Sequence, residues 1–259
     1  MHGTELPFHI DWPAAISRPD LEGDYDRYLV DASVVELLRG RLDLRLSPAS
    51  DRNYLFVHKD FVCPHSRTPE IHFMGTDSVA VIGEKCALSG VILLGSGCVS
   101  AILGHQHALN LEVNLYFDDS FFWGQNSVTY GCRVWVYGRK RIVVGDDCLL
   151  SEGIEIRTSD HHSIIDLETR KQTNFPDDVT IDRHVWVGPH ASIQKGVTIG
   201  KGSIIGSRSV VVGPVPEAEL WAGVPAKRIR KNVSWVSTHP AADPDIDLMV
   251  SRYFPEFYS

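Results

Sequence analysis

The feature that most constrains this sequence is a sixfold repeat over residues 179–212. A large aliphatic residue recurs at every sixth position, and a smaller or β-branched residue recurs two positions before it: Ile181, Val187, Ile193, Ile199, Ile205 and Val211 form the first set, and Val185, Ala191, Val197, Ser203 and Ser209 the second. This period is too long for one helical turn or one strand pleat, so each group of six must form a short strand and a turn. The sequence therefore predicts a prism of stacked coils whose large aliphatic side chains point at a shared axis.

The composition limits the class of protein. A chain of 259 residues that is 43% hydrophobic and 22% charged can bury a sizeable core and form one or two domains. A net charge of −8 and the lack of a basic stripe argue against a nucleic-acid partner, because binding to phosphates needs clustered Lys and Arg. The first residues contain neither a basic flank nor an apolar run, so neither export nor membrane insertion is expected.

The cysteines indicate neither a metal site nor a redox site. They are odd in number, widely separated and without a CxxC pair: Cys63, Cys86, Cys98, Cys132 and Cys148. We expect them to pack as small hydrophobic side chains in a protein of the reducing cytoplasm.

The chain divides into three expected parts. Residues 1–70 are expected to form an N-terminal arm, a helix over residues 24–40 and capping strands, with strands over 42–46 and 53–62 that either begin the prism or cap it. Residues 71–231 form the expected coil domain, in which Ile82, Leu88 and Leu94 carry a degenerate sixfold spacing. The tail, residues 232–259, is expected to contain a short helix that clasps a neighbouring chain or covers the open end of the coil.

Aromatic residues gather where the repeat is blurred, at Tyr116, Phe117, Phe121, Phe122 and Trp123. These residue types fit short strands. An exposed sugar-binding rim and core packing are both open interpretations, and we favour core packing.

A polar interruption at residues 157–178 separates the clean repeat from the coils before it. Some twenty polar residues inside a regular solenoid predict a loop that leaves the stack, and such loops commonly carry function. Its two histidines, His161 and His162, have a side chain whose ordinary pKa suits a general base near neutrality. Counting from the preceding coil leaves the choice between the two histidines open.

The repeat and the loop together resemble a known family. The repeat is similar to that of the hexapeptide-repeat acyltransferases, which implies a left-handed parallel β-helix of three-sided coils. The loop sequence SDHHSIIDLETRKQTN resembles the SDxHSIxDLETxxxIN segment of bacterial polysaccharide O-acetyltransferases, where the histidine before Ser or Pro is the catalytic base. This resemblance implies that His162 is the base. Its separation from Trp186, 186 − 162 = 24 positions, agrees with that of galactoside and maltose acetyltransferases.

Other site residues are expected around this base. Asp160 is expected to orient the imidazole or hold the acceptor, although an aspartate that only forms a turn is an equal alternative. The resemblance implies that Trp186 packs near the thioester and shapes the acceptor pocket, with an aromatic shelf that covers the coil as the alternative. Asn126 is expected to reach the acceptor across a subunit boundary. The segment GPVPEAELWAGVPAKRIRKN resembles the family's terminal PxxxxxxGxPAKxIR, which implies that Lys227 and Arg230 contact the phosphates of coenzyme A.

The donor groove is expected to be lined by Ser207 and Val212. Arg208 departs from the family, which commonly has small residues here, so it either adds a phosphate contact or crowds the groove. No metal is expected as a cofactor.

The expected function is acetyl transfer from acetyl-coenzyme A to a hydroxyl of a carbohydrate acceptor, a capsular or cell-surface polysaccharide or its precursor. His162 is expected to act by direct transfer, and the resemblance implies a homotrimer in which this histidine faces the donor-binding residues of the next chain. Two alternatives are a non-catalytic β-helix scaffold and a metalloprotein like the γ-class carbonic anhydrases, which would draw on a set of histidines: His105, His107, His161, His162, His184 and His190.

Overall fold

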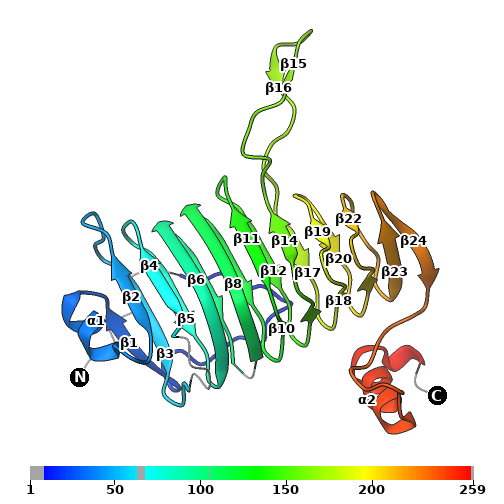
Figure 1. The fold of residues 1–259 in the computed structure, drawn as a ribbon, viewed down its shortest axis with the longest axis horizontal. Helices are drawn as coiled ribbons and strands as arrows, with labels where there is room; N and C mark the ends of the chain where they lie inside the picture. Colours follow the sequence, from blue (N-terminus) through cyan, green and yellow to red (C-terminus); the bar gives the residue numbers. More distant parts are fainter. Residues whose placement is uncertain (1–8, 63–67, 105, 258–259) are drawn as a thin grey trace.

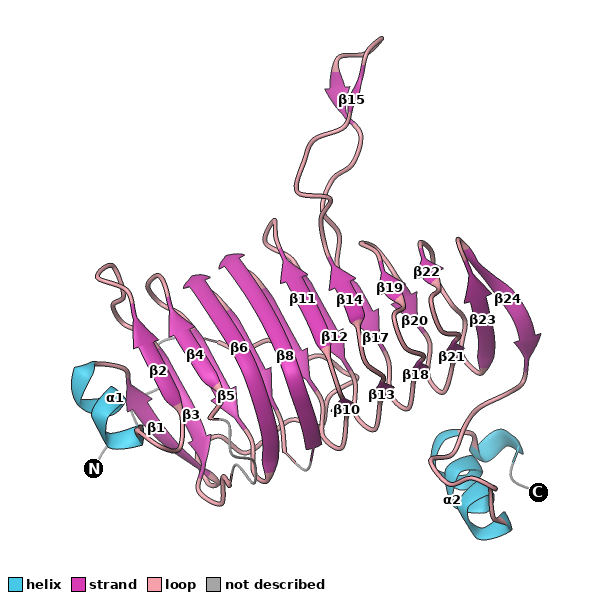
Figure 2. Cartoon of the chain, viewed as in Figure 1, coloured by secondary structure: helices cyan, strands magenta, loops and turns pink. Residues whose placement is uncertain are grey.

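The chain forms a left-handed parallel β-helix of about seven turns, with little helical structure. The structure is a computed structural model and describes residues 9–62, 68–104 and 106–257. Short strands stack into a long three-sided prism, from which one hairpin projects (Figures 1 and 2). The predicted fold class is therefore confirmed.

The first face of the prism is an eight-stranded sheet. Its strands pair in parallel, except that the outermost strand β1 is antiparallel to β3. In sheet order the strands are β1 (Tyr25–Leu29), β3 (Tyr54–His58), β5 (Val79–Ile82), β7 (Val99–Ile102), β9 (Ser120–Trp123), β12 (Arg141–Val144), β17 (Val179–Ile181) and β20 (Thr198–Ile199).

The second and third faces are joined because two long strands, β6 (Cys86–Ser96) and β8 (Gln106–Phe117), pair along both. The second face continues with β10 (Val128–Thr129), β13 (Leu149–Leu150), β18 (Trp186–Val187), β21 (Ile204–Ile205), β23 (Glu219–Gly223) and β24 (Ala226–Lys231). The third face contains β2 (Asp43–Leu46), β4 (Glu70–Phe73), β11 (Cys132–Val136), β14 (Ile154–Arg157), β19 (Ser192–Ile193) and β22 (Val210–Val211). Since β2 and β3 pair in parallel with β4 and β5, these early strands begin the prism.

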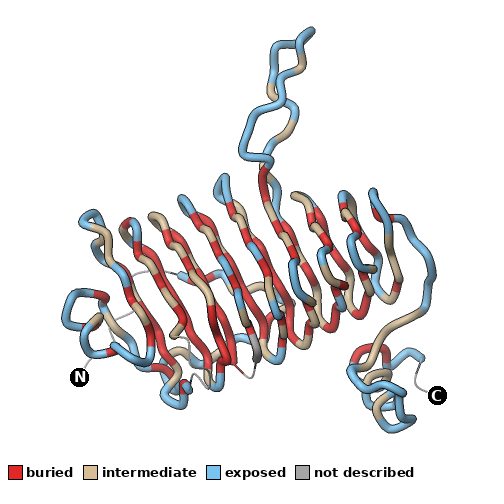
Figure 3. The backbone as a smooth tube through the Cα atoms, viewed as in Figure 1, coloured by how far each residue is buried: buried red, intermediate tan, exposed pale blue. Residues whose placement is uncertain are grey.

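The predicted sixfold positions form the core. All eleven side chains predicted to point inward between Ile181 and Val211 are at most 1% exposed. Figure 3 shows these buried positions as repeating stripes along the tube. The turns follow the same period, because a left-handed backbone conformation recurs every six residues at His184, His190, Gly196, Gly202 and Arg208. Arg208 therefore occupies a turn position that favours glycine.

The helix predicted over residues 24–40 is only partly correct. Its first half is strand β1, because Tyr25–Leu29 pairs with β3. The helix α1 (Ala32–Leu38) begins later, where the carboxylate of Asp31 accepts hydrogen bonds from the backbone of Ser33 and Val34. Residues before β1 lie against the outer side of the first face, where the Trp12 ring packs edge-on against Phe122 at 5.6 Å.

The aromatic cluster divides between the two interpretations. Phe121, Phe122 and Trp123 are buried, as core packing predicts, whereas Tyr116 and Phe117 are exposed at the end of β8. Four of the cysteines are buried free thiols, as predicted: Cys86, Cys98, Cys132 and Cys148. Burial raises the pKa of Cys98 and of Cys148 to about 12. Cys63 lies outside the described residues.

Two edges of the prism matter for function. The loop edge joins the third face to the first and includes residues 116–119, 137–140, 158–178, 194–197 and 212–214. Here the chain leaves the stack as a projecting arm that ends in the strands β15 (Ile165–Asp166) and β16 (Lys171–Gln172) (Figure 1). The tail edge joins the first face to the second and includes residues 124–127, 145–148, 182–185 and 200–203.

The predicted C-terminal helix is present as α2 (Asp243–Tyr253), followed by the 3-10 turn η1 (Pro255–Phe257). It packs along the tail edge of its own chain, where Arg252 and Tyr253 both contact Asp147. It therefore does not cover the open end of the coil.

Candidate active site

The base of the projecting arm holds the predicted base and its aspartate in one hydrogen-bonded unit. The side-chain amide of Asn174 donates to Asp160 Oδ2 at 2.7 Å and to the carbonyl oxygen of His162 at 2.8 Å. Asn174 Oδ1 accepts from the backbone of Ile164 at 2.6 Å, which closes the base of the arm. Lys195, from the next coil, forms an ion pair with Asp160. His162 is thus held through its backbone while its side chain stays exposed.

The charge of Asp160 is set by the same contacts. The hydrogen bond from Lys195, with that from Asn174, lowers the pKa of Asp160 below its ordinary value. The carboxylate is therefore ionised near neutrality. Asn174 belongs to the sequence motif of the loop but carried no predicted role, and Lys195 was missed because its partner lies 35 residues away.

The two adjacent histidines differ in their surroundings. His161 has a left-handed backbone (φ 61°), and its ring lies 5.8 Å from the ring of Tyr137 and 6.3 Å from that of Tyr116. For the His162 ring, no hydrogen bond or ring contact is found with any described residue. His162 is therefore the freer of the two imidazoles.

Trp186 lies on the second face, on the other side of the prism from the loop edge. Its side chain points outward from β18, is 37% exposed and lies 6.2 Å from the ring of Trp235 in the tail. Trp235 in turn stacks on His184 at 4.6 Å, and Tyr253 stacks on His184 at 4.2 Å. The tail is therefore packed beside the tryptophan that the sequence assigned to the donor and the acceptor.

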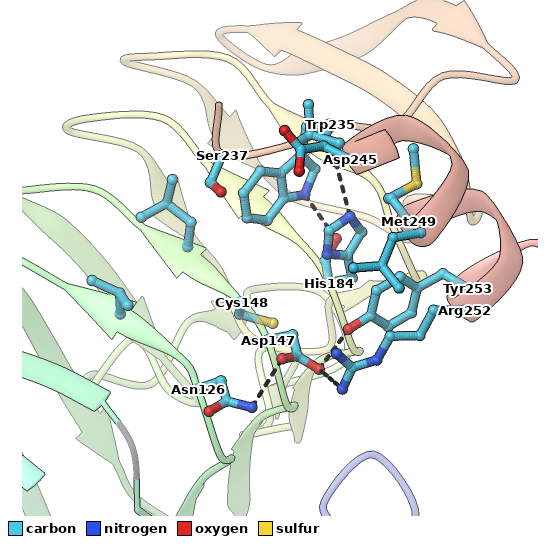
Figure 4. A pocket seen from close by; sticks show the side chains of 14 residues that line it. Asn126, Asp147, Cys148, His184, Trp235, Ser237, Asp245, Met249, Arg252 and Tyr253 are labelled. Atoms are coloured by element: carbon cyan, nitrogen blue, oxygen red, sulfur yellow. Dashed lines mark hydrogen bonds and ion pairs between the residues drawn. The ribbon is translucent and has the colours of Figure 1, made fainter. Parts of the chain in front are cut away.

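Asn126 lines a cavity between the tail and the prism (Figure 4). The cavity has a volume of about 410 Å³ and lies at the tail edge. Asn126 donates to Asp147 Oδ1 at 3.1 Å, while Arg252 and Tyr253 donate to Asp147 Oδ2 at 2.9 and 2.5 Å. In a single chain Asn126 is thus hydrogen-bonded to Asp147, the carboxylate that also binds Arg252 and Tyr253 of the tail. It lies away from His162.

The predicted donor residues occupy two places. Ser207 lies in the turn that joins the second face to the third, and Lys227 and Arg230 lie exposed on β24, which pairs with β23 of the second face. Val212, 59% exposed, follows β22 and lies on the loop edge. One chain therefore does not bring Val212 into the same groove as the other three residues.

The site residues consequently form two separate groups. The loop edge carries His162, Asp160 and Val212, whereas the second face and its borders carry Trp186 and the remaining donor residues. In a three-sided prism an edge lies opposite the face that does not form it, so the two groups point away from each other. A single chain therefore does not bring the two groups of predicted site residues together.

In the described part of the chain, one set of three residues has ligand atoms that could share a metal ion: His58, Asp60 and Glu84. This set includes none of the described histidines of the metalloprotein alternative, and His105 lies outside the described residues. No helix within residues 9–62, 68–104 or 106–257 is long and apolar enough to cross a membrane.

Comparison with known proteins agrees with the repeat and the fold. Residues 178–213 match the family described as bacterial transferase hexapeptide (six repeats). The chain is 33% identical to the polysialic acid O-acetyltransferase of Escherichia coli O1:K1 over 112 residues, which are 43% of this chain and 36% of that protein. The chain thus spans about a third of the length of that relative.

Two further proteins extend the comparison. The Saccharomyces cerevisiae protein YJL218W, which carries the name of an acetyltransferase, is 35% identical over 54% of this chain and 67% of its own length. The solved structure of the polysialic acid O-acetyltransferase OatWY is 26% identical, with a TM-score of 0.68 over 82% of this chain and 95% of that one. On its repeat, its fold and these relatives, the chain belongs to the hexapeptide-repeat acyltransferases.

Proposed function

We propose that this protein is an acetyl-coenzyme A-dependent O-acetyltransferase that acts on a sugar hydroxyl of a capsular or cell-surface polysaccharide or its precursor. The observation that carries the proposal is the base of the arm, where Asn174 and Asp160 fix the backbone of an exposed His162. The similarity to polysialic acid O-acetyltransferases, by sequence and by fold, supports the class of acceptor. In this proposal the enzyme works in the cytoplasm.

The proposed reaction is a direct transfer. The imidazole of His162 takes the proton of the acceptor hydroxyl as the oxygen attacks the thioester carbonyl, and backbone N–H groups of a coil turn stabilise the oxyanion. The C–S bond then breaks, the imidazolium of His162 gives its proton to the sulfur, and coenzyme A leaves as the thiol. Lys227 and Arg230 bind the phosphates of the donor, since both are exposed cations on one strand.

The active enzyme is proposed to be a homotrimer. Two groups of site residues that point away from each other meet when the loop edge of one chain lies against the second face of the next, and such a head-to-tail contact closes into a ring. The arm also supports this arrangement, because it exposes Ile164, Ile165, Leu167 and Phe175 to solvent in the single chain. A neighbouring chain would cover these side chains.

Replacement of the base tests the proposed function. His162→Ala is expected to lower kcat by roughly a hundredfold or more, because the variant lacks the proposed general base. The measurement is thiol release from acetyl-coenzyme A with a panel of mono- and oligosaccharides, together with calorimetry of coenzyme A binding. Retained coenzyme A binding with the loss of kcat supports the assignment, and a variant that turns over at nearly the normal rate contradicts it.

A further inference from the structure

Three aromatic rings form an exposed surface on the loop edge, directly beside His162. The rings of Tyr116 and Tyr137 lie 5.6 Å apart, edge to face, and the ring of His161 lies near both. The two tyrosines are on adjacent rungs, because Leu115 pairs with Val136 immediately before them. The three residues are here called the aromatic edge, and their rings form one compact cluster at the base of the arm.

The backbone of each member of the aromatic edge is fixed by a polar side chain. The carboxylate of buried Asp119 accepts from the backbone of Tyr116 at 3.0 Å, and the hydroxyl of Thr158 accepts from the backbone of Tyr137 at 2.8 Å. Ser159 Oγ accepts from the backbone of His161 at 3.0 Å. Such anchoring reduces the entropy that a ligand must offset on binding.

In the single chain the tyrosine rings are nevertheless accessible. Tyr116 is 39% exposed and Tyr137 is 42% exposed, so each is anchored at its base and open on one side. The neighbouring Asp118 and Arg139 are exposed and form an ion pair of 3.3 Å. A surface that alternates ring faces with charged and hydroxyl groups matches a sugar, which presents C–H faces and hydroxyls together.

We propose that the aromatic edge binds the acceptor glycan at sugar residues beyond the one that is acetylated, so that the enzyme prefers an oligomeric acceptor to a monosaccharide. This inference rests on the proposed function, since it takes His162 as the point where the hydroxyl reacts. The three ring centroids lie 5.6 to 6.3 Å from one another, so the rings form one compact cluster that offers a contact to a sugar residue beyond the one that is acetylated. His161 is thereby a binding residue and His162 the base.

The test compares a monosaccharide with an oligomer of the same sugar. The probes are sialic acid and its tetramer, with galactose and a galacto-tetrasaccharide as a neutral pair, and the variants are Tyr137→Ala, Tyr116→Ala and His161→Ala. Of the two pairs of sugars, the one that the wild-type enzyme acetylates is used for the comparison. For its tetramer, each alanine variant is expected to raise KM by about fivefold to tenfold, because one ring contact is lost. The KM of the monosaccharide, kcat and the KM of acetyl-coenzyme A are expected to change less than about twofold.

Two variants serve as controls. Tyr137→Phe keeps the ring and is expected to recover most of the wild-type KM for the tetramer. Phe257→Ala removes an aromatic side chain of similar exposure, 58%, from the far end of the tail and is expected to have no effect on any KM.

The outcomes separate this inference from the proposed function. Equal changes in KM for monosaccharide and tetramer, or none, overturn the inference, as does a loss of self-association in Tyr137→Ala, which would make the aromatic edge a contact between chains. If the wild-type protein releases no thiol with any acceptor, the proposed function fails. In that case calorimetry of tetramer binding to the wild type and to Tyr137→Ala tests the inference by itself. The inference predicts that the variant binds the tetramer more weakly than the wild type.

Discussion

Lys195 controls the charge of the carboxylate beside the proposed base. Its ion pair with Asp160 lowers the pKa of that carboxyl, and Asn174 connects the same carboxylate to the backbone of His162. Because the folded pKa lies below the unfolded value, this contact stabilises the base of the arm above the ordinary carboxyl pKa of about 4. The stabilisation disappears as the pH falls through the folded value.

The Lys195→Met variant tests this contact. The substitution removes the hydrogen bond that contributes most to the lowered pKa of Asp160. As the pH falls, the arm of the variant is therefore expected to loosen at a higher pH than the arm of the wild type. The measurement is hydrogen exchange of the backbone amides of residues 158–178 between pH 3 and pH 7, about the range where a carboxyl titrates. Identical pH dependence in both proteins would show that Lys195 does not act on Asp160.

Gly202 and Gly196 form a matched pair of turn residues. Both have a left-handed backbone, so an alanine at either costs about 1–2 kcal/mol. A Cβ at Gly202 would also lie 2.2 Å from the ring of Phe254 in the tail, whereas at Gly196 the nearest atom is the flexible Asp177 carboxylate at 3.2 Å. Gly202→Ala should therefore lower the protection of α2 in hydrogen exchange, and Gly196→Ala should not. Equal protection in the two variants would argue against this packing.

At the residue level the sequence predicted the inward aliphatic side chains but not the polar contacts of the loop. Ile193 and its equivalents recur at a fixed interval, so their burial follows from the period alone. The contact between Lys195 and Asp160 does not follow from the sixfold repeat, because it depends on how far the arm leaves the stack. The same holds for the position of Tyr137 beside His161.

The tail is the element whose position the sequence did not predict. An apolar pattern indicated the helix α2, but its contact surface is built from turn residues of three different coils, among them Asp147, His184 and Gly202. The strand β1 was mistaken for helix for a related reason, because its pairing with β3 overrides a local pattern that suits both structures.

The docking of the tail is expected to depend on pH through His184. Burial lowers the pKa of His184, which stacks between Trp235 and Tyr253 and donates from Nε2 to the carbonyl oxygen of Trp235 at 3.0 Å. The undocked imidazole binds a proton more readily than the docked one. Docking is therefore fully stable above about pH 6.5 and weakens as the pH falls below it.

Fluorescence of Trp235 and hydrogen exchange of α2, followed from pH 8 to pH 5 around the ordinary pKa of about 6.5, measure this dependence. The nearby charges of Asp147 and Arg252 act on His184 in opposite directions. In His184→Phe, which keeps a ring between Trp235 and Tyr253 but cannot titrate, the pH dependence should vanish. A tail that stays equally protected at all of these pH values in the wild type would contradict the prediction.

At the scale of the whole molecule, the prism separates the two groups of predicted site residues within one chain. The loop edge and the second face point away from each other, and His162 and Trp186 belong to one group each. The fold class and the loop could be predicted from the sequence because each depends on a pattern of residues that are close together in the chain. The separation of the two groups could not, because it depends on which face each six-residue unit occupies.

The measurement that tests the central claim most directly mixes two variants that the account expects to be nearly inactive, His162→Ala and Trp186→Ala. If each site takes its base from one chain and its tryptophan from the next, an equal mixture that is unfolded and reassembled contains intact sites at about one quarter of the positions. Thiol release from acetyl-coenzyme A is therefore predicted to recover to about one quarter of the wild-type rate, while each variant reassembled alone stays inactive. No recovery in a mixture that reassembles normally would contradict the account.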